Sequence, residues 1–208
     1  MHANVGLVKT FTANGAINEN RIVSFSGGNR IAAQAAASTE SFAGVAAVPT
    51  GATIADGDPF DVIKSGVADV LYGGTIAVGN RLTTNSLGKA VSAEAMFSGK
   101  TEIVDGGSAG NITVTGITTS DVLTAVLYYP ISADTGTSAT GNKVTSVSDL
   151  TSEFSISATN TINNTGGTAT TGGKLEVRYR RKISIIGTAE MAGVSGDIGS
   201  VLINIHAL

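Results

Sequence analysis

Residues that commonly carry catalysis or bind metals are scarce in this chain. Cysteine is absent from its 208 residues, and the two histidines, His2 and His206, lie near opposite ends. The absence of cysteine excludes disulfides and thiolate metal sites. A histidine-based triad or a two-histidine metal site would have to recruit a chain end. The sequence therefore predicts no catalytic residues, and we expect the protein not to be an enzyme.

Three acidic residues, Asp56, Asp58 and Asp61, lie close enough in sequence to suggest a calcium loop. Calcium needs six or more oxygen ligands, usually including a bidentate carboxylate at the end of the loop. Pro59 interrupts the run and no glutamate closes it, so the pattern disfavours calcium. The glycine-rich stretches lack the Lys-Ser or Lys-Thr of a phosphate-binding loop and are typical of turns. We therefore expect no metal and no cofactor.

One basic cluster stands out, and its members are Arg178, Arg180, Arg181 and Lys182. Because side chains alternate along a strand, Arg178 and Arg180 are expected to share one face. Two interpretations remain open. The cluster is either a solvated face or a set of possible ion-pair contacts to an acidic partner surface. A net charge of −3 and a pI near 5.3 argue against binding nucleic acid through its phosphate backbone.

The elements that carry these residues are predicted to be strands. Charged residues make up only 14% of the chain and aromatic residues 5%, whereas 27 residues are glycine. Such a composition suits short strands and many turns, so we expect an all-β fold. The clearest strand is Lys174 to Arg180, where apolar and polar residues alternate. Ala32 to Phe42 remains open between a helix and a loop or strand edge, because alanine favours helix but Ser38-Thr39 interrupts it.

A membrane partner is not expected. No apolar run approaches the roughly 18 residues that a membrane-spanning helix needs. The first twelve residues also lack the apolar core of a signal peptide. The sequence therefore predicts a soluble protein that is made and kept in a cytoplasm-like setting.

The composition changes at about Met96. From Ser98 to Lys182 the chain becomes rich in threonine, serine, glycine and asparagine, with several predicted strands and the turns between them. This stretch is predicted to form a small β-sandwich of its own.

A pattern of small residues occurs on both sides of the insert. Its parts are Ala55–Ile63, Gly73–Leu82 and Leu87–Val91 before the insert, and Ile186–Gly193 and Gly196–Ile203 after it. These stretches resemble the capsid decoration, or cement, proteins of tailed phages. In that family, "Ala-Gly-Asp-Arg-Val-Thr…Gly-Lys-Ala-Val" is followed shortly by "Ile-Gly-x-Ala…Gly-Asp…Ser-Val-Leu-Ile". Here the closing stretch is displaced about 85 residues downstream. The resemblance therefore implies a discontinuous domain, residues 1–96 plus 183–208, and a second domain, residues 97–182, that is inserted into it. Insertions of this kind are tolerated at exposed loops whose two ends lie close together.

The resemblance implies a β-tulip-like domain that forms homotrimers at the three-fold sites of an icosahedral head. It also implies binding to the major capsid protein, on the outer surface of a virion assembled in the host cytoplasm. The protein is then expected to stabilise the mature capsid, with the inserted domain projecting outward. The alternative is a virion surface module that binds a host receptor or a carbohydrate through the inserted domain.

The N-terminal segment Ala3 to Thr12 is interpreted as an arm. It carries too few apolar residues to fold alone, and an arm of this kind could add a strand to a sheet edge of the capsid protein. Its candidate capsid-binding residues are Val5, Leu7, Lys9 and Phe11. On this interpretation, removing residues 1 to 12 leaves the fold intact and abolishes capsid binding.

Overall fold

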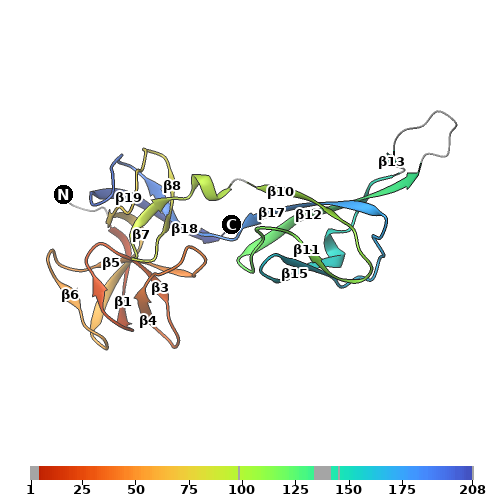
Figure 1. The fold of residues 1–208 in the computed structure, drawn as a ribbon. Helices are drawn as coiled ribbons and strands as arrows, with labels where there is room; N and C mark the ends of the chain where they lie inside the picture. The colour runs from red at the N-terminus through yellow and green to blue at the C-terminus, as the bar shows by residue number, and fades with distance from the viewer. Residues whose placement is uncertain (1–4, 98, 134–141, 145, 208) are drawn as a thin grey trace. The chain divides into compact units, whose positions relative to one another are not determined.

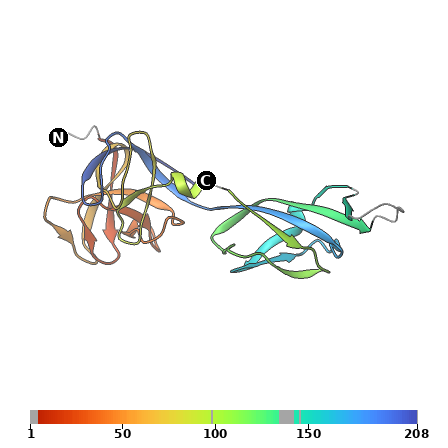
Figure 2. The same ribbon diagram turned by 45° about the horizontal axis from the view of Figure 1, so that its top comes forward.

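The computed structural model describes residues 5–97, 99–133, 142–144 and 146–207 of the chain (Figures 1 and 2). Strands make up nearly all of its regular structure, so the predicted all-β fold is confirmed. The described residues divide into two compact units: Met1–Ala95 together with Ile183–Leu208, and Met96–Lys182. The first unit is therefore discontinuous in sequence, and we describe each unit by itself. Among the described residues, no helix is long and apolar enough to cross a membrane.

The first unit consists of eleven strands, and one short 3-10 helix, η1 (Glu94–Phe97), follows its ninth strand. Its strands are β1 (Val5–Ala13), β2 (Ile17–Asn18), β3 (Ile22–Phe25), β4 (Ile31–Gln34), β5 (Phe42–Ala47), β6 (Thr53–Ile54), β7 (Pro59–Leu71), β8 (Arg81–Thr84), β9 (Ala90–Ser92), β18 (Ser184–Ala189) and β19 (Ile198–Ala207). Nine of them form one sheet in the order β1-β4-β3-β5-β7-β19-β18-β8-β9, and β2 pairs with β6.

A further pairing between β1 and β7 closes the first five strands of this sheet into a small barrel. Strand β7 has 13 residues, which is long enough for its two halves to pair with different strands. Its first half pairs with β1 and β5 in the barrel, and its second half pairs with β19. One cluster of buried apolar residues, including Phe11, Val23 and Phe60, belongs to the barrel strands. A second cluster, including Tyr72, Leu82 and Val201, includes residues from the rest of the sheet.

The second unit contains two sheets that enclose one core. Its elements are β10 (Lys100–Asp105), β11 (Gly110–Thr113), β12 (Asp121–Ala133), β13 (Asn142–Val144), β14 (Ser148–Asp149), the 3-10 helix η2 (Thr151–Glu153), β15 (Phe154–Ala158), β16 (Thr161–Asn164) and β17 (Gly173–Arg181). The larger sheet has the order β10-β17-β12-β13, with β14 also on β12, and the smaller has the order β11-β16-β15. Ile112 and Ile162 of the smaller sheet share a core with Val126 and Val177 of the larger one. This arrangement is a β-sandwich.

The interpretation of the N-terminal segment as a free arm is wrong. Residues 5–13 form β1, which pairs antiparallel with β7 and parallel with β4. Phe11 lies opposite Phe60 and is buried in the barrel core. The segment has few apolar residues because only one face of the strand is buried, which a strand at a barrel wall requires. Residues 1–4 lie outside the described residues.

The helix considered for Ala32 to Phe42 is also absent. Residues 31–34 form β4, which is hydrogen-bonded on both sides, to β3 and to β1. Ala32 and Ala35 are fully buried, so the small alanine side chains serve close packing between elements rather than helix formation. Tertiary pairing outweighs the modest intrinsic preference of alanine for helix, which is worth only a fraction of a kcal/mol per residue.

The close packing of Gly199, in β19, against Tyr72 of the second cluster can be tested by mutation. A Cβ atom at Gly199 would overlap the ring of Tyr72, which is fully buried and whose hydroxyl donates a hydrogen bond to the Met191 carbonyl (2.9 Å). Overpacking a core typically costs 1–3 kcal/mol. We expect Gly199→Ala to lower the free energy of unfolding of the first unit by about 2–3 kcal/mol in urea denaturation. Gly74→Ala is the control, because its Cβ would meet only Val91, at 3.9 Å. Equal midpoints for the two variants would contradict this packing.

Candidate interaction surfaces

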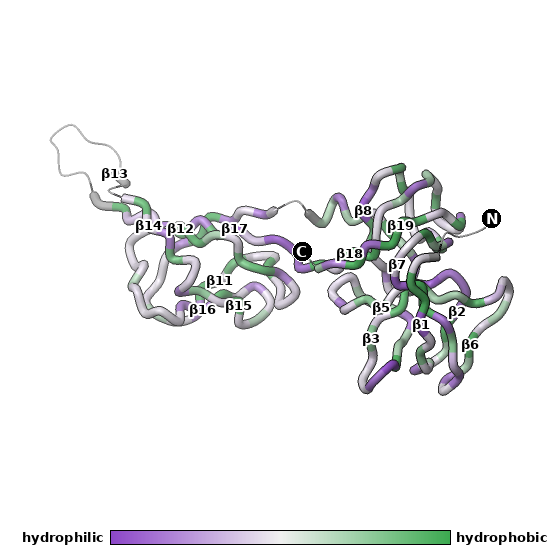
Figure 3. Tube along the Cα trace, turned by 180° about the vertical axis from the view of Figure 1, so that it is seen from behind, coloured by the Kyte–Doolittle hydropathy of each residue, from purple (hydrophilic) through white to green (hydrophobic). Residues whose placement is uncertain are grey.

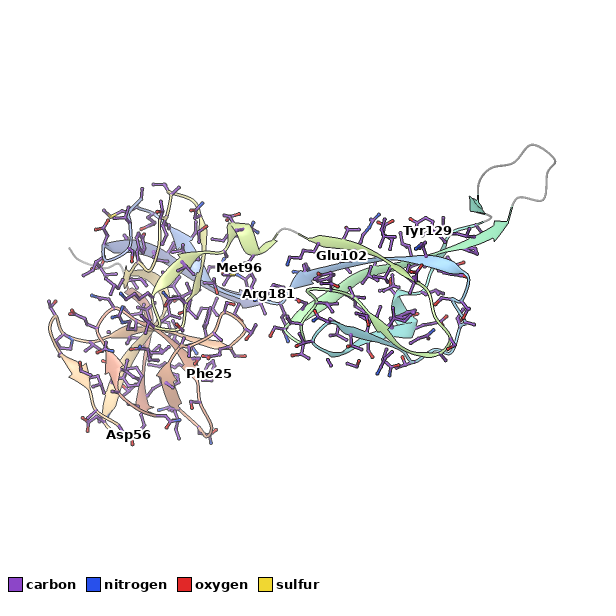
Figure 4. The ribbon with its side chains drawn as sticks, viewed as in Figure 1. Phe25, Asp56, Met96, Glu102, Tyr129 and Arg181 are labelled. Carbon is purple, nitrogen blue, oxygen red and sulfur yellow. The ribbon has the colours of Figure 1, made fainter. Side chains whose placement is uncertain are left out.

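An exposed aromatic ring marks the first candidate surface, on the first unit. Phe25, at the end of β3, is 51% exposed, and Figure 4 labels it. Its ring centroid lies 6.0 Å from that of the buried Phe11, with the two rings tilted by 55°. The ammonium group of Lys64, on β7, lies 4.9 Å from the Phe25 centroid and 5.7 Å from that of Phe11. These distances are typical of cation–π contacts, which hold the ammonium over the rings.

A second lysine belongs to the same surface. Lys9 lies two residues before Phe11 on β1 and opposite Val62 of β7, and Val62 lies two residues before Lys64. Since alternate residues of a strand share a face, Lys9 and Lys64 lie on the same side of this strand pair. Among the described residues, no carboxylate forms an ion pair with Lys9 or Lys64. We refer to Lys9, Phe11, Phe25 and Lys64 as the aromatic–lysine cluster.

The cluster is basic within an acidic unit. Residues 1–95 and 183–208 contain six lysines and arginines against nine aspartates and glutamates, which gives a net charge of −3. The second unit, residues 96–182, has seven of each and is neutral. General solubility therefore does not explain why two lysines that form no ion pair with any described residue share one face of the β1–β7 pair, one of them over an exposed phenylalanine.

The residues predicted from the N-terminal segment have different environments. Leu7 and Lys9 are exposed on β1, whereas Phe11 is buried beneath Lys64. The side chain of Val5 lies outside the described residues. Sequence reasoning missed Phe25 and Lys64. A signal for Lys64 was present, because Phe60, Val62 and Lys64 alternate along β7 and place a cation on the face that otherwise carries buried apolar residues.

Half of the basic cluster of the second unit is engaged in internal ion pairs. Arg178 and Arg180 alternate with buried residues along β17, as the sequence pattern predicts. Arg178 pairs with Glu176 of the same strand (2.6 Å), and Arg181 pairs with Asp121 of β12 (3.3 Å). Among the described residues, Arg180 and Lys182 form no such pair. Two of the four basic residues therefore already have partners within their own unit.

A groove lies on the outer face of the larger sheet of the second unit. Its volume is about 350 Å³, and its lining residues are Ile103, Tyr129, Ile131, Lys174 and Glu176. The Tyr129 hydroxyl donates a hydrogen bond to Oε2 of Glu176 (2.7 Å), and Nε of Arg178 donates to Oε1 (2.6 Å). Both hydrogen bonds stabilise the ionised carboxylate and therefore hold the pKa of Glu176 below its usual range. The hydrogen bond from Tyr129 makes the largest contribution, followed by the one from Arg178.

A titration tests this network. Tyr129→Phe removes the hydroxyl donor, so the Glu176 carboxylate loses its largest stabilising contact and its pKa should rise toward the ordinary value of a glutamate. An NMR titration of the Glu176 carboxyl carbon measures this shift. Tyr128→Phe is the matched control, because the Tyr128 hydroxyl donates to the Thr171 carbonyl instead. An unchanged pKa in Tyr129→Phe would contradict the assigned cause.

Two of the three aspartates considered for calcium, Asp56 and Asp61, have structural roles. Asp56 accepts a hydrogen bond from the Gly15 amide (2.7 Å), and Asp61 accepts one from the Thr10 hydroxyl (2.8 Å). The Asp61 hydrogen bond therefore links β7 to β1, and the Asp56 hydrogen bond links the segment before β7 to the turn that follows β1. Within the described ranges, no group of three or more histidine, cysteine, aspartate or glutamate side chains is placed to hold a metal ion.

One string, Gly106-Gly107-Ser108-Ala109-Gly110, has the Gly-x-Ser-x-Gly pattern found around nucleophilic serines. In hydrolases that pattern forms a sharp turn between a strand and a helix. Here it connects β10 to β11, two strands, and Gly107 exchanges hydrogen bonds with the hydroxyl of buried Thr170 (3.0 Å each). The string therefore forms a loop between strands and lacks the strand-to-helix context of a nucleophile.

Comparison with known proteins gives little. No family model and no curated protein sequence matches the chain. Among solved structures, the N base of the head fibre gp8.5 of bacteriophage phi29 is similar, with a TM-score of 0.40 and 15% sequence identity. The alignment covers 95% of this chain and 93% of that one. A similarity at this TM-score does not indicate a function, which therefore has to be inferred from the residues themselves.

Proposed function

We propose that this chain is a structural protein of a tailed-phage virion, that it binds the outer surface of the mature capsid and stabilises it, and that it is not an enzyme. The supporting observation is the way the first unit is assembled. The stretches that resemble capsid decoration proteins are separated by about 85 additional residues, yet they lie side by side in one sheet. Gly187 of the closing stretch pairs with Leu82 of the opening one, and Ile76 of the opening stretch forms a bridge with Gly193 of the closing one.

The mechanism is stabilisation by preferential binding. A ligand that binds the mature lattice and not its disrupted form stabilises the lattice by mass action. At a free concentration of one hundred times Kd, each occupied site contributes about 2.7 kcal/mol. A shell filled with DNA is under outward pressure and fails where its subunits meet. A protein that bridges such contacts therefore raises the temperature at which the head opens.

A homotrimer on the lattice is part of the proposal, because several weak contacts then act together. The first unit offers an exposed apolar surface for self-association. On β19, Ile198 and Leu202 are about half exposed, and they pair across the sheet with Leu71 and Val67 of β7. Figure 3 shows β19 and β7 next to each other in the first unit. Light scattering of the purified protein and a cryo-EM map of the parent virion test this proposal. A monomer both in solution and on the lattice would refute the trimer, and a map without this protein on the head would refute the function.

The groove of the second unit favours a second candidate function, in which that unit binds a carbohydrate. Tyr129 and the mainly apolar lining offer a surface for the apolar face of a sugar ring, and Lys174 and Glu176 flank it with polar groups. A saccharide array probed with the protein tests this candidate. Binding that is lost in Tyr129→Ala and kept in Tyr128→Ala would support it, whereas no binding to any saccharide would refute it.

A further inference from the structure

We propose that the aromatic–lysine cluster is the docking site for an acidic peptide segment on the surface of the capsid protein. In this arrangement a carboxylate of that segment lies between the ammonium groups of Lys9 and Lys64, and neighbouring apolar atoms cover Phe25. The choice of the capsid protein as the source rests on the proposed function. The chemistry of the site rests on the cluster alone.

Lys64 is the first part of the argument. Its two alternate neighbours on β7, Phe60 and Val62, are buried in the barrel, and Lys64 itself is half-buried on the same face. A lysine in this position gives up part of its hydration and of its rotamer freedom. Its ammonium is held over two aromatic rings, and no carboxylate of the described residues pairs with it. The cation is therefore positioned in advance, and no described residue of its own unit supplies an anionic partner.

Phe25 is the second part of the argument. Aromatic side chains at surfaces often supply the apolar anchor of an interface. About half of Phe25 is exposed, and its ring lies near the Phe11 ring and the Lys64 ammonium. A docked segment that covers the ring removes apolar surface from water. The same segment excludes water from the ion pair beside the ring, which strengthens the attraction between the charges.

The net negative charge of the first unit favours an acidic peptide over nucleic acid as the partner. Nucleic acid presents one phosphate after another, and a unit with a net charge of −3 repels such a backbone as a whole. Two lysines beside one phenylalanine match a short contact in which one or two carboxylates stand next to apolar side chains. An acidic peptide segment has this combination of groups.

A peptide titration tests the site itself. The probe is acetyl-Gly-Asp-Leu-Asp-Gly-amide, and the control is the same peptide with both aspartates replaced by asparagine. We expect saturable NMR shifts at the Lys64 side chain and the Phe25 ring with the acidic peptide and none with the neutral one. Lys64→Met keeps the length of the side chain and removes the charge, and it should weaken binding at least fivefold. Lys89→Met, a first-unit lysine that contacts neither ring, should leave binding unchanged.

Equal shifts with both peptides, or unchanged binding by Lys64→Met, would overturn the proposal. A second arm measures binding to mature heads, where Lys64→Met is expected to weaken binding at least tenfold and Lys89→Met is not. If the wild-type protein binds heads and the peptide arm fails, this inference is wrong and the proposed function stands. If the acidic peptide binds as expected and the wild-type protein does not bind heads, the site is an acidic-peptide site, but the capsid protein is not the source of the peptide segment. If Lys64→Met instead abolishes self-association, the occupant is a second copy and the inference is overturned.

Discussion

Removal of residues 1–13 is expected to unfold the first unit and leave the second unit folded. Strand β1 is one of the five strands that close the barrel, and it pairs with both β7 and β4. It also contributes Phe11 and Ala13 to the barrel core. Truncating one buried phenylalanine to alanine typically costs 3–5 kcal/mol, and a whole domain is stable by only 5–15 kcal/mol. Loss of the entire strand therefore removes most or all of the stability of the unit.

Heteronuclear NMR spectra measure this outcome one unit at a time. Amide signals of the first unit should collapse to random-coil positions, while those of the second unit keep their dispersion, because its core is built from its own residues. Two point variants on the same strand calibrate the result. Phe11→Ala should destabilise the first unit by about 3–5 kcal/mol, and Leu7→Ala, whose side chain is exposed, by less than about 0.5 kcal/mol. A truncated protein with wild-type spectra would contradict the barrel.

Replacement of Met96–Lys182 by a short Gly-Ser linker is expected to leave a folded first unit that still binds heads. Both flanks of the replaced segment are fixed within that unit. The Ala93 amide donates a hydrogen bond to the Arg81 carbonyl (2.8 Å), and the Ser184 amide donates one to the Ser38 carbonyl (2.7 Å). The strands on either side also belong to one sheet, since β18 pairs with β8. The linker therefore only has to connect two chain ends that the first unit already holds in place.

The deletion protein is judged by its thermal unfolding and by its binding to heads. We expect the midpoint of the first unit to change by no more than a few degrees and the affinity for heads to remain within about threefold, a difference of less than 1 kcal/mol. A deletion protein that is unfolded would show that the second unit is needed for the fold. One that folds and fails to bind would place the capsid contact in the second unit, and would contradict the assignment of head binding to the first unit.

The sequence predicts some elements well because their signals are local. Strand β17 alternates in apolar character over successive residues, and its buried residues, Leu175, Val177 and Tyr179, are those that the alternation indicates. All-β character follows from composition, because glycine, threonine and small β-branched residues favour short strands and turns.

Other features depend on partners far away in the chain. Strand β1 resembles an unpaired arm when it is inspected alone, and its partner β7 begins about fifty residues later. The alanines of β4 favour helix locally, and only the pairing with β3 and β1 makes them strand. The ion pairs of Arg178 and Arg181 depend on which carboxylates the β12–β17 register brings near, and single-sequence patterns do not fix that register. The aromatic–lysine cluster combines three strands, β1, β3 and β7, so the sequence carried a local signal for Lys64 alone and none for the cluster as a whole.

The central claim, that this protein binds and stabilises the mature head, is tested most directly by titrating it onto heads of the parent phage that lack it. Mature heads and unexpanded precursor heads are compared, and the temperature of DNA release is followed together with the bound amount. The account predicts saturable binding to mature heads, little binding to precursor heads, and a release temperature that rises with occupancy. Absence of binding to mature heads, or binding that leaves the release temperature unchanged, would contradict it.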